Sequence, residues 1–137
     1  MILLDTNVIV SLLDISEPLS GRARATLRKL ERQSLAVIPA VLTEALFFLH
    51  SSRSRLALRE WLAHGNITRL DTIEEGDHEA EVIDWLLRYA DHEPDYADGC
   101  LCVLSNLLPK AKVWTYDSEF STIWRRPDGS RVPLVSG

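Results

Sequence analysis

The stretch Ile2-Leu3-Leu4-Asp5-Thr6-Asn7 opens the chain and predicts its fold class. Three consecutive apolar residues are typical of a short strand that is buried on both faces, as strands are in a parallel sheet. The run stops at Asp5, and the apolar segment 8–13 then predicts a helix. Asp5 therefore stands where a strand ends and a helix begins. It could bind a ligand there, because ligands bind beyond the carboxyl ends of such strands, or it could simply cap the helix.

The rest of the chain alternates between the same two patterns. Apolar runs predict further strands at 35–38, 67–70 and 112–115, and an edge strand at 131–135. Helical spacing of apolar residues predicts helices that start near 20 and 40, cover about 55–63 and 82–90, and run from about 97 to 108. Alternation of this kind is typical of α/β proteins. We therefore predict one domain, residues 1–137, with three α/β/α layers around a mostly parallel sheet of about five strands.

Composition narrows the class of protein. A chain of 137 residues with 46% hydrophobic residues is large enough to bury a single core. No apolar run approaches the roughly 20 residues that a membrane span needs, and no basic leader precedes the first strand. Cys100 and Cys102 lie two apart in an expected helix and so point to different faces, which favours reduced packing residues over a disulfide. These features predict a cytoplasmic protein without a membrane segment.

Charge is segregated along the chain. The net charge of −5 argues against broad attraction to nucleic acid. Basic residues crowd the segments 22–32 and 53–59, whereas residues 71–98 hold eleven acids and one arginine. Solvated helix faces explain such a distribution. It would equally suit a protein that grips phosphates with one rim and a cation with the other.

Acidic residues follow the ends of several predicted elements. Right-handed crossovers bring the carboxyl ends of parallel strands to one edge of the sheet, so these acids are expected to converge there. Two carboxylates about 4 Å apart repel by about 4 kcal/mol at an effective dielectric constant near 20, so a cation or a proton must compensate them. Oxygen ligands suit Mg²⁺ or Mn²⁺, and the four histidines show no spacing typical of zinc. The acids concerned are Asp5, Glu44, Asp95, Asp98, Asp117 and Glu119.

Four short motifs together resemble the PIN-domain family, which includes the VapC toxins of type II toxin–antitoxin systems. Each motif is weak alone, but their order, spacing and position at element boundaries are fairly specific, and the likeness covers nearly the whole chain. Gly99 departs from the pattern, because relatives often have alanine there. The motifs are Leu3-Leu4-Asp5-Thr6, Leu42-Thr43-Glu44, Pro94-Asp95-Tyr96-Ala97-Asp98 and Trp114-Thr115-Tyr116-Asp117-Ser118-Glu119-Phe120.

The resemblance implies a Mg²⁺- or Mn²⁺-dependent ribonuclease, a homodimer, and a cognate antitoxin whose tail covers the acidic site. By motif position, the catalytic and metal-binding acids are Asp5, Glu44, Asp98 and Asp117. The residues expected to support them are Asn7, Asp95, Thr115 and Glu119. Arginine can hold phosphate in a bidentate way, so we expect contacts to the RNA backbone from Arg53, Arg55 and Arg125.

Two other functions are open on the sequence alone. A haloacid-dehalogenase-like phosphatase also has an aspartate after its first strand, but it would need a second aspartate where Asn7 stands. A catalytically inert PIN-like binding module would keep the fold without turnover.

Large apolar residues on the expected helices exceed what one core obviously needs. An exposed patch of that kind usually marks an interface, which agrees with the expected dimer. The residues are Phe47, Phe48, Leu56, Trp61, Trp85 and Tyr89.

Overall fold

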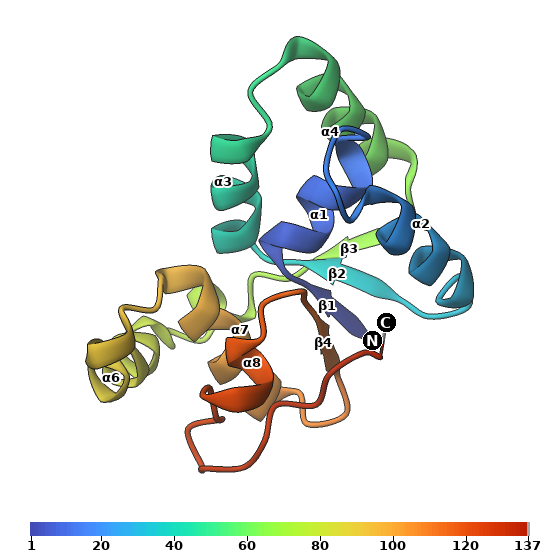
Figure 1. Cartoon of the computed structure of the whole chain (residues 1–137). Helices are drawn as coiled ribbons and strands as arrows, with labels where there is room; N and C mark the ends of the chain where they lie inside the picture. The colour runs from blue at the N-terminus through green and yellow to red at the C-terminus, as the bar shows by residue number, and fades with distance from the viewer. Residues whose placement is uncertain (137) are drawn as a thin grey trace.

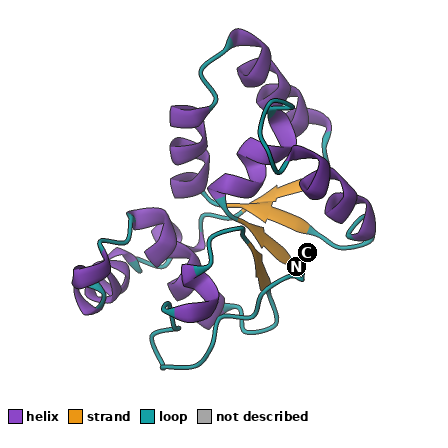
Figure 2. Cartoon of the chain, viewed as in Figure 1, coloured by secondary structure: helices purple, strands orange, loops and turns teal. Residues whose placement is uncertain are grey.

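Four short parallel strands form the central sheet of the computed structural model, which describes residues 1–136 (Figure 2). Their spatial order is β3-β2-β1-β4, so the first strand of the chain lies in the interior of the sheet. Every β1 residue is buried, as its unbroken apolar run predicts. The strands are β1 (Ile2–Leu4), β2 (Leu35–Val37), β3 (Ile67–Arg69) and β4 (Lys112–Trp114).

Helices cover both faces of this sheet and confirm the predicted α/β/α layering. In Figure 1, α1, α2 and α4 lie on one side of the sheet and α7 and α8 on the other. α3 contacts both α1 and α7, and α6 packs along α7. The helices are α1 (Thr6–Leu13), α2 (Ser20–Lys29), α3 (Pro39–Phe48), α4 (Ser52–His64), α5 (Thr72–Glu75), α6 (Glu79–Arg88), the 3-10 turn η1 (Ala90–His92), α7 (Tyr96–Leu107) and α8 (Glu119–Thr122).

The predicted edge strand at 131–135 is reduced to two isolated bridges, Leu134 with Val113 and Arg131 with Arg125, so the sheet has four strands and not about five. Val113 donates to the carbonyl of Pro133 at 2.8 Å and accepts from the Val135 N–H at 2.9 Å. Pro133 has no N–H with which to extend that ladder, because its nitrogen belongs to the ring. The segment therefore lies beside β4 in parallel without forming a longer strand.

An aromatic cluster fastens the C-terminal segment to α6. The ring of Trp85 lies 4.7 Å from that of Tyr89 and 5.2 Å from that of Trp124, between ring centroids. Trp85 Nε1 donates to the Arg125 carbonyl at 2.8 Å, and the Tyr89 hydroxyl accepts from the Arg125 N–H at 3.1 Å. The expectation that Trp85 and Tyr89 contribute to an exposed patch is therefore wrong for Trp85, which is buried, and Tyr89 is only half-buried.

The packing of α6 on α7 also explains Gly99. A Cβ atom at this position would lie 3.0 Å from Val82 Cγ1 and 3.2 Å from Trp85 Cε3. The glycine lets the two helices approach each other closely, and an alanine at this position would require Val82 or Trp85 to shift. Cys100 and Cys102 are buried free cysteines on the same helix, as predicted. Within residues 1–136, no helix is both long enough and apolar enough to span a membrane.

Candidate active site

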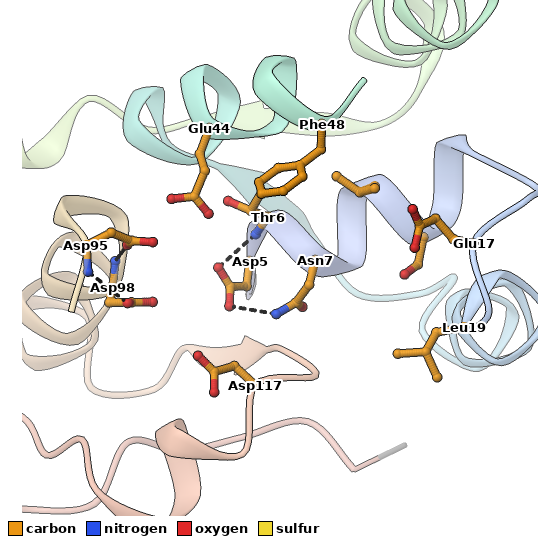
Figure 3. Close-up of a pocket in the computed structure, with 12 residues that line it drawn as sticks. Asp5, Thr6, Asn7, Glu17, Leu19, Glu44, Phe48, Asp95, Asp98 and Asp117 are labelled. Carbon is orange, nitrogen blue, oxygen red and sulfur yellow. Dashed lines mark hydrogen bonds between the residues drawn. The ribbon is translucent and has the colours of Figure 1, made fainter. Parts of the chain in front are cut away.

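An acidic cleft of about 370 Å³ opens at the carboxyl edge of the sheet, where β1 and β4 are neighbours (Figure 3). The chain leaves β1 into α1 and leaves β4 toward α8, and α3 and α7 form the opposite wall. Such a crevice beyond the strand ends is where open α/β sheets bind ligands. Six acids line it, and none of the described lining residues is Lys, Arg or His. The acids are Asp5, Glu17, Glu44, Asp95, Asp98 and Asp117.

Asp5 is both a helix cap and a cleft residue, so the two roles that its position suggests are not exclusive. It is the N-cap of α1, and its Oδ1 accepts from the Thr6 N–H at 2.7 Å. Its side chain nevertheless faces the cleft, although the residue is only 4% exposed. Burial raises its pKa to about 6, against the opposing effect of its hydrogen bond with Thr115.

A hydrogen-bond network behind Asp5 fixes the orientation of its carboxylate. Thr115 Oγ1 donates to Asp5 Oδ2 at 2.7 Å and accepts from the Asp117 N–H at 3.0 Å. Asn7 Nδ2 donates to the same Oδ2 at 3.3 Å, and its Oδ1 accepts from the Tyr116 N–H at 2.9 Å. The ends of β1 and β4 are thus joined by side chains as well as by the strand ladder.

Asp95 and Asp98 meet the cleft from the start of α7, where they form a capping box. Asp95 Oδ1 accepts from the Asp98 N–H at 2.8 Å, and Asp98 Oδ2 accepts from the Asp95 N–H at 3.1 Å. These bonds fix both side chains at the helix N-terminus and leave their other oxygens toward the cleft. Burial and then the charges of Asp95 and Asp5 raise the pKa of Asp98 to about 8.

Glu44 and Asp117 complete the cluster from opposite sides. Glu44 projects from α3 toward Asp5, and burial followed by the proximity of Asp95 raises its pKa to about 7. Asp117 Oδ1 accepts from the Glu119 N–H at 2.9 Å, which orients the carboxylate as α8 begins. The structure therefore brings the four predicted acids to one cleft, together with Asp95.

The donor set of the cleft fits a hard divalent cation that keeps some of its water. All six ionisable groups are carboxylates, and three have raised pKa values, as expected of acids crowded without a counter-charge. Thr6 also lines the cleft, and its buried side chain lies close enough to Glu44 to lower the pKa of that carboxyl group, against the larger effect of burial. Within residues 1–136, no three acidic, histidine or cysteine side chains are close enough to hold one ion directly. Mg²⁺ is commonly held by one or two carboxylates plus water, so this spacing suits it.

Comparison with known proteins agrees with this arrangement. The PIN domain family model matches residues 2–124. The chain belongs to the PIN domain family. No match is found among curated proteins.

Two solved structures share the fold of this PIN domain. VapC20 of Mycobacterium tuberculosis, a toxin that cleaves the sarcin-ricin loop, has a TM-score of 0.70 at 17% identity, over 89% of this chain and 94% of that one. FitAcB of Neisseria gonorrhoeae has a TM-score of 0.57 at 24% identity, over 86% of this chain and 88% of that one. At these identities the likeness concerns the fold.

Several residues expected at the site lie outside the cleft of this PIN domain. Glu119 contributes its backbone N–H to Asp117, but its side chain is not among the residues that line the cleft. Arg53, Arg55 and Arg125 do not line it either. Their contact with RNA stays a prediction.

Two residues that line the cleft were not expected there from sequence, whereas Arg22 belongs to the basic segment 22–32 that we considered for gripping phosphates. Glu17, in the turn between α1 and α2, and Phe48, at the end of α3, both line it. Arg22 stacks over the ring of Tyr116, with its guanidinium carbon 4.9 Å from the ring centroid. Because the Tyr116 N–H bonds to Asn7, this contact places a member of the basic 22–32 segment beside the site.

Arg55 has a structural role that its sequence position did not suggest. Its Nε donates to the Leu49 carbonyl at 2.7 Å and its Nη2 to the Leu46 carbonyl at 3.0 Å, so it caps the C-terminal end of α3. We expect Arg55→Ala to lower the free energy of unfolding by roughly 1 kcal/mol, because two helix carbonyls lose a charged donor. Arg53→Ala, at an exposed position on the same helix, is the control, and urea denaturation measures both. Equal stability of the two variants would contradict this capping role.

Proposed function

We propose that this PIN domain is a metal-dependent ribonuclease and the toxin of a toxin–antitoxin pair. The observation that carries the proposal is the convergence of Asp5, Glu44, Asp98 and Asp117 on one open cleft whose described lining includes no basic side chain. Family membership and the fold shared with VapC20, a toxin that cleaves RNA, support it. The phosphatase alternative is dropped, because the family match covers the motifs on which that alternative depended.

The hydrogen bonds and orientations of the cleft residues suggest different roles for them. We propose that Asp5 and Asp98 bind Mg²⁺ or Mn²⁺ most directly, since both are anchored by hydrogen bonds and face one another across the cleft. The ion, when bound, would activate water and stabilise negative charge on the phosphoryl oxygens. Thr115 and Asn7 hold Asp5 in its orientation.

Glu44 is suited to proton transfer. Its side chain projects into the cleft toward Asp5, and burial together with the proximity of Asp95 raises its pKa to about 7, which favours a role in accepting and releasing a proton. We propose that it accepts the proton of the attacking water as the water oxygen bonds to phosphorus. The bond from phosphorus to the 3′ oxygen of the preceding nucleotide breaks, and that oxygen takes a proton from solvent water and leaves as a 3′ hydroxyl. Asp117 faces the cleft opposite α3 and would assist in binding the ion.

The products of RNA cleavage test this function. Attack by water leaves a 5′ phosphate and a 3′ hydroxyl, whereas attack by the neighbouring ribose 2′ hydroxyl leaves a 2′,3′-cyclic phosphate. We expect cleavage of total RNA with Mg²⁺ or Mn²⁺, none in EDTA, and products that carry 5′ phosphates. Cyclic phosphate ends would contradict the hydrolytic mechanism. Metal binding without any cleavage would favour the inert binding module.

A homodimer is the assembly that we propose for this chain. The face formed by α3 and α4 has a groove whose apolar lining includes Leu42, Leu46 and Leu62 and whose polar lining is three arginines, and Leu56 on α4 is 55% exposed. Exposed apolar surface of this kind suits a second copy of the chain. Light scattering at micromolar concentration should give twice the mass of 15.5 kDa, and Leu46→Asp should return it to a monomer. A monomeric wild type would contradict the proposal.

We further propose that an antitoxin segment occupies the acidic cleft. The charge of the cleft favours a partner that inserts an arginine or lysine side chain, which would compete with Mg²⁺ for the same carboxylates. Titration of the purified complex with Mg²⁺ should then weaken the inhibition. Inhibition that leaves Mg²⁺ affinity unchanged would place the partner elsewhere on the surface.

A further inference from the structure

Phe48 presents an exposed aromatic ring to a cleft that six acidic residues line. The residue is 59% exposed, yet its ring lines the cleft beside Thr6 (Figure 3). It follows Glu44 by one helical turn, so both side chains project from the same face of α3. The ring therefore lies next to the carboxylate that we assign to proton transfer.

The core does not require this ring. α3 and the residue after it contribute Val41, Ala45 and Leu49 to the core, and each of these is at most 1% exposed. A phenylalanine that is more than half exposed leaves apolar surface in water, which is unfavourable. Surface of this kind next to a polar cleft is typical of a ligand contact.

The charge of the cleft points to the nature of that contact. Six acids line the cleft, and the described lining includes no basic side chain, so the cleft itself repels an RNA backbone. Within this lining, affinity for the nucleotides at the reacting bond then depends on the metal ion and on uncharged contacts. Stacking of a base on an aromatic ring is such a contact, and proteins that bind single-stranded nucleic acid use it widely.

We propose that Phe48 stacks on an unpaired nucleobase next to the phosphate that is cleaved. The inference rests on the proposed ribonuclease function and assigns Phe48 as a substrate contact of that site, made to a base that is unpaired at the cut. A base within a duplex has both faces covered by its neighbours and cannot stack on the ring. The Phe48 contact thus selects loops, bulges and other unpaired segments over continuous helices.

A series of substitutions at position 48 tests this. Binding of a labelled single-stranded RNA of about 12 nucleotides, within the span such sites cover, is measured by fluorescence anisotropy. All proteins carry Asp5→Asn to suppress cleavage. We expect Phe48→Ala to weaken binding about 10-fold, Phe48→Leu to weaken it similarly, and Phe48→Trp to retain it, because stacking needs a flat ring and not only apolar volume.

The matched control is Phe47→Ala. Phe47 is the neighbouring residue on α3 and is 70% exposed, but it lines a separate groove with Tyr96 and not the cleft. Its replacement should leave RNA affinity unchanged. The salt dependence of binding should keep the same slope in Phe48→Ala, since no phosphate contact is lost. The same RNA annealed to its complement should bind all the variants alike.

Three results would overturn the proposal. Unchanged affinity in Phe48→Ala would assign the ring to a protein partner and not to RNA. Full binding by Phe48→Leu would mean that the ring acts only through its apolar volume. Equal losses on single-stranded and duplex RNA would remove the selectivity. Because the assay reads binding and not cleavage, failure of the ribonuclease function would show separately, as metal-dependent cleavage absent from the wild type.

Discussion

Asp5→Asn is expected to lower the rate of RNA cleavage by at least about 1,000-fold, the loss that follows when several kcal/mol of metal-dependent stabilisation are removed. Asparagine has the shape of aspartate and can still accept from the Thr6 N–H, so the cap of α1 is kept. It supplies no negative charge to a cation. The loss should therefore reflect chemistry and not unfolding.

Asp84→Asn is the matched control for this variant. Asp84 is an exposed aspartate on α6 and does not line the cleft, so the substitution removes one charge without touching the site. Both proteins are assayed on the same RNA with saturating Mg²⁺, and circular dichroism checks their folding. Full activity in Asp5→Asn would refute the assignment of Asp5 to the site.

The second large effect is on stability, which we expect to fall as pH rises in the metal-free protein. Asp5 has a pKa of about 6 in the folded state against 3.8 ordinarily, so between these values the folded protein holds a proton that the unfolded chain has released. Ionisation of Asp5 therefore costs about 3 kcal/mol of stability once the pH exceeds 6. Glu44 and Asp98, with pKa values of about 7 and 8, extend the decline toward pH 8.

Thermal unfolding in EDTA across pH 4 to 8 measures this decline. Asp5→Asn should be more stable than wild type at pH 8 and nearly equal to it at pH 4, because the wild-type carboxyl is then largely protonated in the folded state. Mg²⁺ should raise the melting temperature more at pH 8 than at pH 5, since it binds the ionised acids. A wild-type melting temperature that rises steadily with pH would contradict this account.

The fold followed from the sequence because its signals are local. Each buried strand is a short run of apolar residues. At Asp5, the fully buried strand β1 ends and helix α1 begins, and the Asp5 side chain caps that helix. The pairing of Asp95 with Asp98 could be predicted for the same reason, because residues three apart at the start of a helix can form a capping box. α5 and α8 were missed because four residues are too few to show helical periodicity.

Which residues line the cleft depends on tertiary packing, so several of them could not be predicted from the sequence. Glu17 lines the cleft only because the turn after α1 folds back toward the site, and nothing in its neighbours signals this. Phe48 follows an apolar helix pattern and was assigned to an interface, whereas its place beside Glu44 depends on how α3 packs against α1 and α7. The capping role of Arg55 could not be predicted, because the sequence does not show that α4 turns back to the end of α3.

Calorimetric titration with Mn²⁺ tests most directly whether the carboxylates of this cleft bind a divalent ion through Asp5. At pH 7 we expect the wild type to bind Mn²⁺ and to release protons to the buffer, because Asp98 and Glu44 are partly protonated before the ion arrives. Asp5→Asn should bind Mn²⁺ at least about tenfold more weakly than the wild type, because the loss of even a residue that only orients a ligand commonly costs that much affinity. Equal Mn²⁺ affinity in the two proteins, with no proton release from either, would contradict the account.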